Sequence, residues 1–185
     1  MSNLPGRRVT YEEYLALDAA SDEKLEYERG EVFVLGRGTL EHSRLQATIG
    51  YALSNATDRR PCTVYSSSAR IRAVKTDRAC YPDVTVVCGP AKTLPGDPHT
   101  ITNPTILVEV LSESTEANDR GAKWAHYRRI DSLQEYVLVN QTEPRIEVYR
   151  REGQFWLFAE YGPGTHVDLR SIEGRISVDE IYRTR

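Results

Sequence analysis

The sequence predicts an α/β domain in which parallel and antiparallel strands occur together. Residues 106–111 and 134–139 are two apolar runs typical of buried strands, and residues 118–130 between them are predicted as a helix. A strand–helix–strand unit of this length pairs its strands in parallel, with a right-handed crossover. An antiparallel extension is expected from three shorter strands joined by turns, at residues 145–150, 154–160 and 165–169.

Length and composition predict one domain spanning residues 1–185, with 39% hydrophobic and 28% charged residues. The formal net charge of -3 excludes a global attraction to nucleic acid or anionic membranes, so polyanion binding would need a local basic patch. No apolar run approaches the roughly 20 residues of a membrane span, and no signal-peptide pattern is present. We therefore expect a cytoplasmic protein without membrane contact. The three cysteines form no CxxC pair and indicate neither a disulfide framework nor a zinc site.

Residues 24–35 predict a hairpin around Arg29 and Gly30, with Gly30 at the positive φ of the turn. Glu28 and Glu31 flank this turn and face one another. Like charges in that position are unfavourable unless they are solvated or share a cation. Solvation is the preferred interpretation.

Residues 41–56 predict a helix whose apolar residues recur at helical spacing, and His42 falls on that apolar face. A single histidine there is most simply a hydrogen-bonded core residue. Beyond the helix, residues 62–66 and 69–74 are predicted as paired strands. The second carries part of the most basic stretch of the chain, and its candidates for phosphate contacts are Arg70, Arg72 and Lys75. A solvated strand face explains them equally well.

The segment 103–112, NPTILVEVLS, contains the residue that most needs an explanation. It is typical of a strand covered on both faces, yet Glu109 lies in its middle. An unpaired carboxylate there is costly to desolvate, so Glu109 requires a partner. That partner is a buried Arg or Lys, a shared proton or a metal ion.

Two further residues are placed to meet Glu109. Asp83 opens the strand that follows Pro82, and Lys123 lies about one turn into the helix after Glu109. Two carboxylates and the backbone carbonyl of Val110 form a hard oxygen site suited to Mg²⁺ or Mn²⁺, and Lys123 can act on water or phosphate beside it. Such a set suits metal-assisted hydrolysis of a phosphodiester.

The alternative is purely structural. Glu109 then forms a buried ion pair with Arg72 or Lys123, and Asp83 is only a residue at the start of a strand. Asp119, Lys123 and Tyr127, spaced at i, i+4 and i+8, line one helix face, and Asp119 with Lys123 can form an exposed pair.

The order of several short motifs resembles the Uma family of restriction-endonuclease-like proteins, within the PD-(D/E)XK nuclease superfamily. The motifs are residues 27–31 (YERGE), His42, residues 81–83 (YPD), residues 109–112 (EVLS), Asp119-x3-Lys123-x3-Tyr127, and Glu135-Tyr136. The resemblance covers about residues 10–148. It implies a restriction-endonuclease-like mixed sheet flanked by helices.

The resemblance also implies site residues. Asp83 and Glu109 correspond to the Mg²⁺ ligands. The superfamily often places its lysine two residues after the glutamate, where this chain has Leu111, so Lys123 is expected to reach the site from the next helix. Glu31 and His42 are expected as further site members, without assigned roles.

The main hypothesis is a Mg²⁺-dependent endonuclease acting on DNA. A second is a non-catalytic nucleic-acid-binding or protein-binding module that retains the nuclease fold. A third, less favoured, is a metal-independent hydrolase with His42 as base, because no serine or cysteine nucleophile is evident. The edge offered by the C-terminal strands suggests a homodimer.

Overall fold

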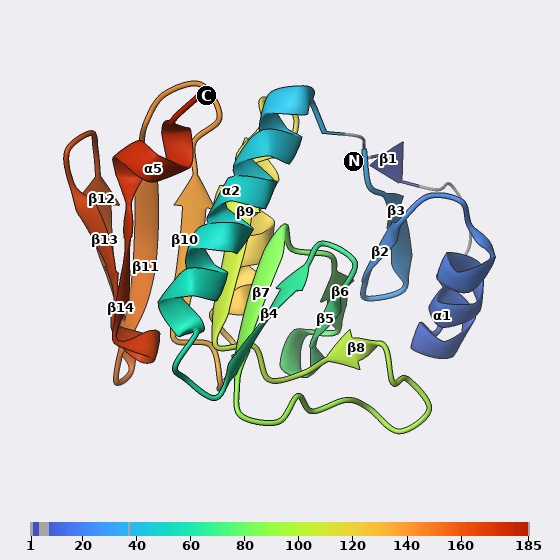
Figure 1. Ribbon diagram of the computed structural model, residues 1–185. Coiled ribbons are helices and arrows are strands. Elements are labelled where there is room, and N and C mark those ends of the chain that lie inside the picture. Colours follow the sequence, from blue (N-terminus) through green and yellow to red (C-terminus); the bar gives the residue numbers. More distant parts are fainter. Residues whose placement is uncertain (1, 4–7, 37, 185) are drawn as a thin grey trace.

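The computed structural model of the chain describes residues 2–3, 8–36 and 38–184. They form two six-stranded sheets and a separate two-stranded one. Figure 1 shows the sheet that contains β2 and β3 beside α1, while α2 crosses in front of the other six-stranded sheet, here called the central sheet, which contains β9 and β10. None of the helices in the described part of the chain is long and apolar enough to cross a membrane.

The central sheet contains the predicted strand–helix–strand unit. Its order is β12-β11-β10-β9-β7-β4, and β9 pairs with β10 in parallel whereas the other pairs are antiparallel. The predicted mixed sheet is therefore confirmed. Its strands are β4 (Cys62–Ser66), β7 (Val84–Cys88), β9 (Ile106–Val110), β10 (Glu135–Val139), β11 (Ile146–Glu152) and β12 (Phe155–Tyr161).

The other large sheet contains the predicted hairpin. Its order is β1-β3-β2-β6-β5-β8. At the hairpin turn both Arg29 (φ 49°) and Gly30 (φ 92°) are left-handed, as a tight turn between twisted strands requires. The strands are β1 (Ser2–Asn3), β2 (Leu25–Glu28), β3 (Glu31–Val34), β5 (Arg70–Ala73), β6 (Arg78–Cys80) and β8 (Thr100–Ile101).

Helices cover both faces of the central sheet. Leu45, Ile49 and Leu53 of α2 are buried against the valines of β7, β9 and β10, which confirms the predicted apolar face. The helices are α1 (Tyr11–Ala20), α2 (Leu40–Thr57), α3 (Glu116–Asn118), the π-helix η2 (Asp119–Lys123), α4 (Trp124–Tyr127) and α5 (Val178–Tyr182), with short 3₁₀ turns η1 (Val74–Thr76) and η3 (Arg170–Ile172). The small sheet pairs β13 (His166–Leu169) with β14 (Gly174–Ser177).

Two predicted details of these elements are wrong. The helix expected at residues 118–130 begins two residues earlier and consists of three short pieces at 116–127. The strands at 62–66 and 69–74 exist but do not pair with each other. The turn between them moves the chain from the central sheet to the other one, so β4 pairs with β7 whereas β5 pairs with β6 and β8.

The cysteines also differ from the prediction. Cys62 and Cys88 lie directly opposite each other on β4 and β7 and form a disulfide. This disulfide was not predicted, because the pairing depends on the register of two strands whose cysteines are 26 residues apart. Cys80 is free and buried. Burial raises the pKa of its thiol to about 11, which keeps it protonated and unreactive at neutral pH.

These assignments predict a thiol count. In protein purified without reductant, a thiol-specific chromogenic reagent should find no thiol in the folded state and one, Cys80, after denaturation. Denaturation with reduction should expose all three cysteines. Three thiols in denatured, unreduced protein would contradict the disulfide, and a reactive thiol in folded protein would contradict the burial of Cys80.

Candidate active site

Glu109 lies in the middle of β9 and is 3% exposed. Strand alternation places it on the same face as Leu107 and Leu111, so its carboxylate enters an apolar layer. Its Oε1 accepts hydrogen bonds from Lys123 Nζ at 3.0 Å and from the Tyr127 hydroxyl at 2.9 Å. Burial raises the pKa of Glu109 well above its ordinary value, although Lys123 opposes this shift. The partner that this strand requires is thus a lysine and a phenol.

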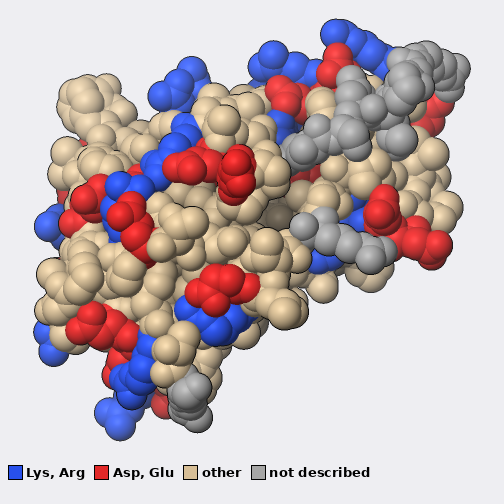
Figure 2. Space-filling view, turned by 90° about the horizontal axis from the view of Figure 1, so that it is seen from above, with Lys and Arg blue, Asp and Glu red and all other residues tan. Residues whose placement is uncertain are grey.

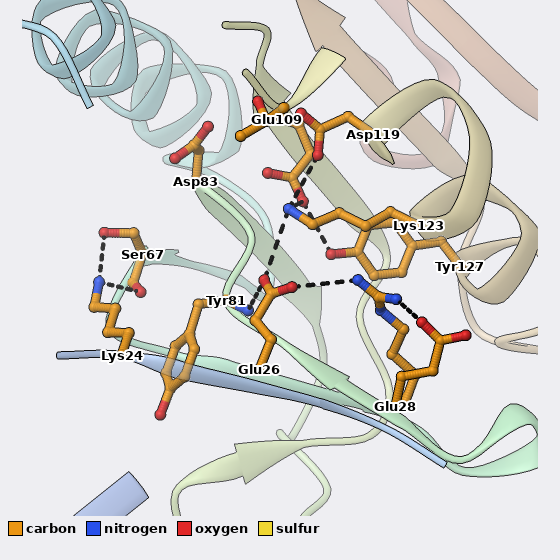
Figure 3. A network of polar contacts seen from close by, with 12 residues as sticks. Lys24, Glu26, Glu28, Ser67, Tyr81, Asp83, Glu109, Asp119, Lys123 and Tyr127 are labelled. Carbon is orange, nitrogen blue, oxygen red and sulfur yellow. Dashed lines mark hydrogen bonds and ion pairs between the residues drawn. The ribbon is translucent and has the colours of Figure 1, made fainter. Parts of the chain in front are cut away.

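Lys123 is the centre of a buried ionic cluster (Figure 3). Its Nζ lies 3.0 Å from Glu109, 3.1 Å from Asp119 and 3.8 Å from Glu26. Burial alone would lower the pKa of Lys123, but these acids outweigh it and raise the pKa well above its ordinary value. The surrounding acids therefore favour the protonated amine. The exposed helical pair considered for Asp119 and Lys123 is wrong, because both residues are almost completely buried.

A π-helical turn presents the lysine to the sheet. The segment Asp119–Lys123 is π-helical, and Asp119, Lys123 and Tyr127 point toward the glutamate as their spacing predicted (Figure 3). Isolated π turns widen a helix locally and occur frequently at functional sites. The Tyr136 hydroxyl donates to the Asp119 carbonyl at 3.1 Å and links this turn to the sheet.

Asp83 lies immediately before β7, and Figure 3 shows it near Glu109. Its Oδ2 accepts the Val110 N–H at 2.7 Å, so Asp83 is joined to the residue that follows Glu109. Its Oδ1 accepts hydrogen bonds from His42 Nε2 at 3.0 Å and Gln46 Nε2 at 3.2 Å. The hydrogen bond to Asp83 raises the pKa of His42. The predicted apolar-face histidine is therefore a direct partner of a site carboxylate.

A cleft of about 400 Å³ opens beside this end of the cluster. Asp83 and His42 contribute to its wall together with Lys24, Ser67 and Tyr81. A larger groove of about 780 Å³ runs between α2 and α5, but none of the clustered acids lines it. Of the clustered acids, Asp83 alone lines the smaller cleft, so this cleft reaches the cluster from the side of Asp83.

The hairpin acids behave differently from each other. Glu31 is exposed opposite Glu28, and no polar contact among the described residues joins it to the cluster. Glu31, expected as a site member, lies outside the cluster. Glu28 binds Arg78 and lies 3.0 Å from His126 Nε2, so a cation neutralises this acid. Glu31 is exposed and pairs with no cation among the described residues, so solvation relieves its charge as expected.

Glu26 is the site residue that sequence reasoning missed. It is completely buried, and its carboxylate accepts the Tyr81 N–H and an Arg78 N–H, both at 3.3 Å, beside Lys123. The available signal was an acid at alternate spacing from Glu28 on β2. This spacing does not by itself place Glu26 in the site, because its position beside Lys123 depends on the pairing of β2 with β6, 50 residues away.

Carboxylate oxygens, the donor type that hard divalent cations prefer, gather at this place. Three acids, Glu26, Glu109 and Asp119, surround the buried Lys123, and Arg78 also pairs with Glu26. Asp83 adds a fourth acid through its hydrogen bond to the Val110 N–H. Asp119 Oδ1 is buried without a hydrogen bond of good geometry, and Glu109 Oε2 accepts none from the described residues. Within residues 2–3, 8–36 and 38–184, no three His, Cys, Asp or Glu side chains are arranged to hold a metal ion.

The arginines expected to contact phosphates are already engaged. Arg70 is buried between Asp18, at 2.5 Å, and Asp97, at 3.0 Å. Arg72 is also buried and ion-paired, although not with Glu109. Lys75 is exposed and pairs with an aspartate at 2.6 Å. Neither arginine is free for phosphate contacts or lies on a solvated strand face.

Replacing Lys123 with Met should destabilise the protein by about 3–5 kcal/mol, because buried acids would lose their cation. Adding Glu109→Gln should restore part of this loss by removing one charge. Lys92→Met, at an exposed position, is the control and should change little. Chemical denaturation measures all three variants. Equal stability of Lys123→Met and the unmodified protein would contradict the proposed charge balance.

Comparison with known proteins identifies the family and the fold. The family model described as "Uma2: Putative restriction endonuclease" matches residues 11–178. Two proteins of Synechocystis sp. (strain ATCC 27184 / PCC 6803 / Kazusa) are similar in sequence. Uncharacterized protein slr1290 is 35% identical over 97% of this chain and 94% of its own. Uncharacterized protein sll1609 is 31% identical over 82% and 86%.

A solved structure shares the fold. It is the crystal structure of "a putative nuclease belonging to DUF820" from Anabaena variabilis ATCC 29413, with a TM-score of 0.76 at 18% identity. The match covers 94% of this chain and 97% of the other. The restriction-endonuclease-like fold expected from the motifs is confirmed. The family model spans nearly the whole chain, and the chain therefore belongs to the Uma2 family of restriction-endonuclease-like proteins.

Proposed function

We propose that this protein is a metal-dependent nuclease that hydrolyses phosphodiester bonds of DNA with Mg²⁺ or Mn²⁺. The observation that carries the proposal is the buried Glu109, held by Lys123 and one residue away from the Val110 amide that binds Asp83. Structural ion pairs need no second carboxylate beside them and no excess of acids. A Mg²⁺ site, by contrast, is commonly built from one or two carboxylates together with water.

Asp83, Glu109 and the carbonyl of Val110 would hold the ion. When bound, Mg²⁺ lowers the pKa of a coordinated water and offsets charge that develops on the phosphate. His42 and Gln46 both lie on α2 and hydrogen-bond to Asp83 Oδ1. The helix therefore positions the Asp83 carboxylate. Lys123 keeps its proton, so it donates to oxygen and stabilises negative charge rather than acting as a base.

The substrate assignment rests on the family description and on the cleft. Figure 2 shows basic and acidic residues interspersed over the face in view. This face therefore carries no broad basic patch that would attract DNA. Lys24 lines the cleft, donates to Ser67 and forms no ion pair with a described carboxylate. Lys24 therefore replaces Arg70 and Arg72 as our candidate for a phosphate contact. We also propose that the protein acts in the cytoplasm.

A binding module that retains the fold is the second candidate. Glu109 is already neutralised in part by Lys123 and Tyr127, without any ion. In that case the cluster serves only to join the two sheets. Titration calorimetry with Mg²⁺ and Mn²⁺ separates the two, since the nuclease proposal requires metal-dependent heat that Asp83→Asn and Glu109→Gln reduce.

Asp83→Asn and Glu109→Gln should each lower plasmid cleavage in Mg²⁺ at least about 100-fold, because each removes a charged ligand without changing side-chain shape. Asp131→Asn is the matched control, since Asp131 is exposed and pairs only with Lys75 among the described residues. Gel assays of supercoiled plasmid measure the rates. Cleavage that persists in both variants, or in excess chelator, would overturn the assigned site and favour a metal-independent reaction.

A further inference from the structure

The strand β12 leaves one edge of the central sheet open. It is the outermost strand in the order β12-β11-β10-β9-β7-β4 and pairs with β11 over seven residues. On its other side no strand of the described residues pairs with it. Its outward N–H and C=O groups therefore form an edge to which another strand can bind.

Apolar side chains are exposed on both faces of this edge. Phe155 and Leu157 are 66% and 52% exposed on one face, and Phe158 is 54% exposed on the other, beside the half-buried Trp156. Of the large hydrophobic residues exposed in the described chain, these three lie within four consecutive positions. A partner docked on one face of the sheet would cover only one set. A strand added at the edge brings side chains to both faces at once.

The other sheet edges lack this combination. The outer strands β1 and β8 have two residues each, which gives little to bind. The strand β4, at the far edge of the central sheet, exposes Thr63 and Ser66. In β12 the segment FWLFAEY contains no proline or lysine and one charge, Glu160, so the usual protections of an edge are absent.

We propose that two copies of the chain associate through β12, antiparallel about a two-fold axis at Leu157, and form one continuous sheet. In this register Trp156 lies opposite Phe158 of the partner subunit, and Phe155 opposite the partner's Ala159. Glu160 faces the neutral Gln154 of the partner subunit rather than another acid. A register centred one residue later places Glu160 opposite an indole, which is why Leu157 is the centre.

The mass in solution tests the association. Light scattering after size exclusion should give twice the chain mass of 21.0 kDa for the unmodified protein. Leu157→Lys places two like charges at the axis and should give 21.0 kDa. Leu40→Lys, at a 92% exposed position on α2, is the control and should remain a dimer. A monomeric unmodified protein, or a dimeric Leu157→Lys with native circular dichroism, overturns the proposal.

A cysteine placed on the axis tests the register, and it does not depend on how a lysine affects folding. Leu157→Cys should give a covalent dimer under mild oxidation, because a residue on a two-fold axis meets its own copy. Phe155→Cys, two positions away on the same face, should remain uncrosslinked. Equal crosslinking of both variants, or of neither, contradicts the register.

Discussion

The ion pair between Lys123 and Glu109 is the interaction on which the rest of the structure depends. Glu109 comes from the central sheet, Glu26 from the other sheet and Asp119 from the helical segment that covers both, and all three converge on one amine. A buried pair of this kind adds little stability compared with apolar packing, but it admits few arrangements of the parts that supply it. It therefore fixes how the two sheets and the helix meet.

Local patterns in the sequence were enough to predict half of this site. The apolar run around Glu109 identified a buried strand with an anomalous charge, and helical spacing placed Asp119, Lys123 and Tyr127 on one face. Both patterns depend only on neighbours within one element, so they hold in any tertiary context. The absence of a lysine two residues after Glu109 also fits, since Leu111 is buried in an apolar cluster.

Contacts between distant segments could not be predicted in this way. The role of Glu26 requires the pairing of β2 with β6, the disulfide requires the register of β4 with β7, and the burial of Arg70 requires α1 and β8 to close over it. A basic stretch in a sequence does not show whether nearby acids will neutralise it. The π turn at Asp119–Lys123 was likewise not predicted, because the i, i+4 spacing of Asp119 and Lys123 is equally typical of an ordinary α-helix.

The position of the lysine on a helix has a consequence for how this family's site can vary. Where acid and lysine share a strand, the covalent backbone sets their separation. Here it depends on aromatic packing: Trp124, next to Lys123, stacks on Tyr149 with ring centres 4.5 Å apart. Tyr149 packs in the apolar cluster beside Trp124, and a change in its size would shift the amine relative to Glu109. Substitutions at such aromatic residues can thus change the separation of Lys123 and Glu109 in small increments, while every charged residue of the cluster is retained.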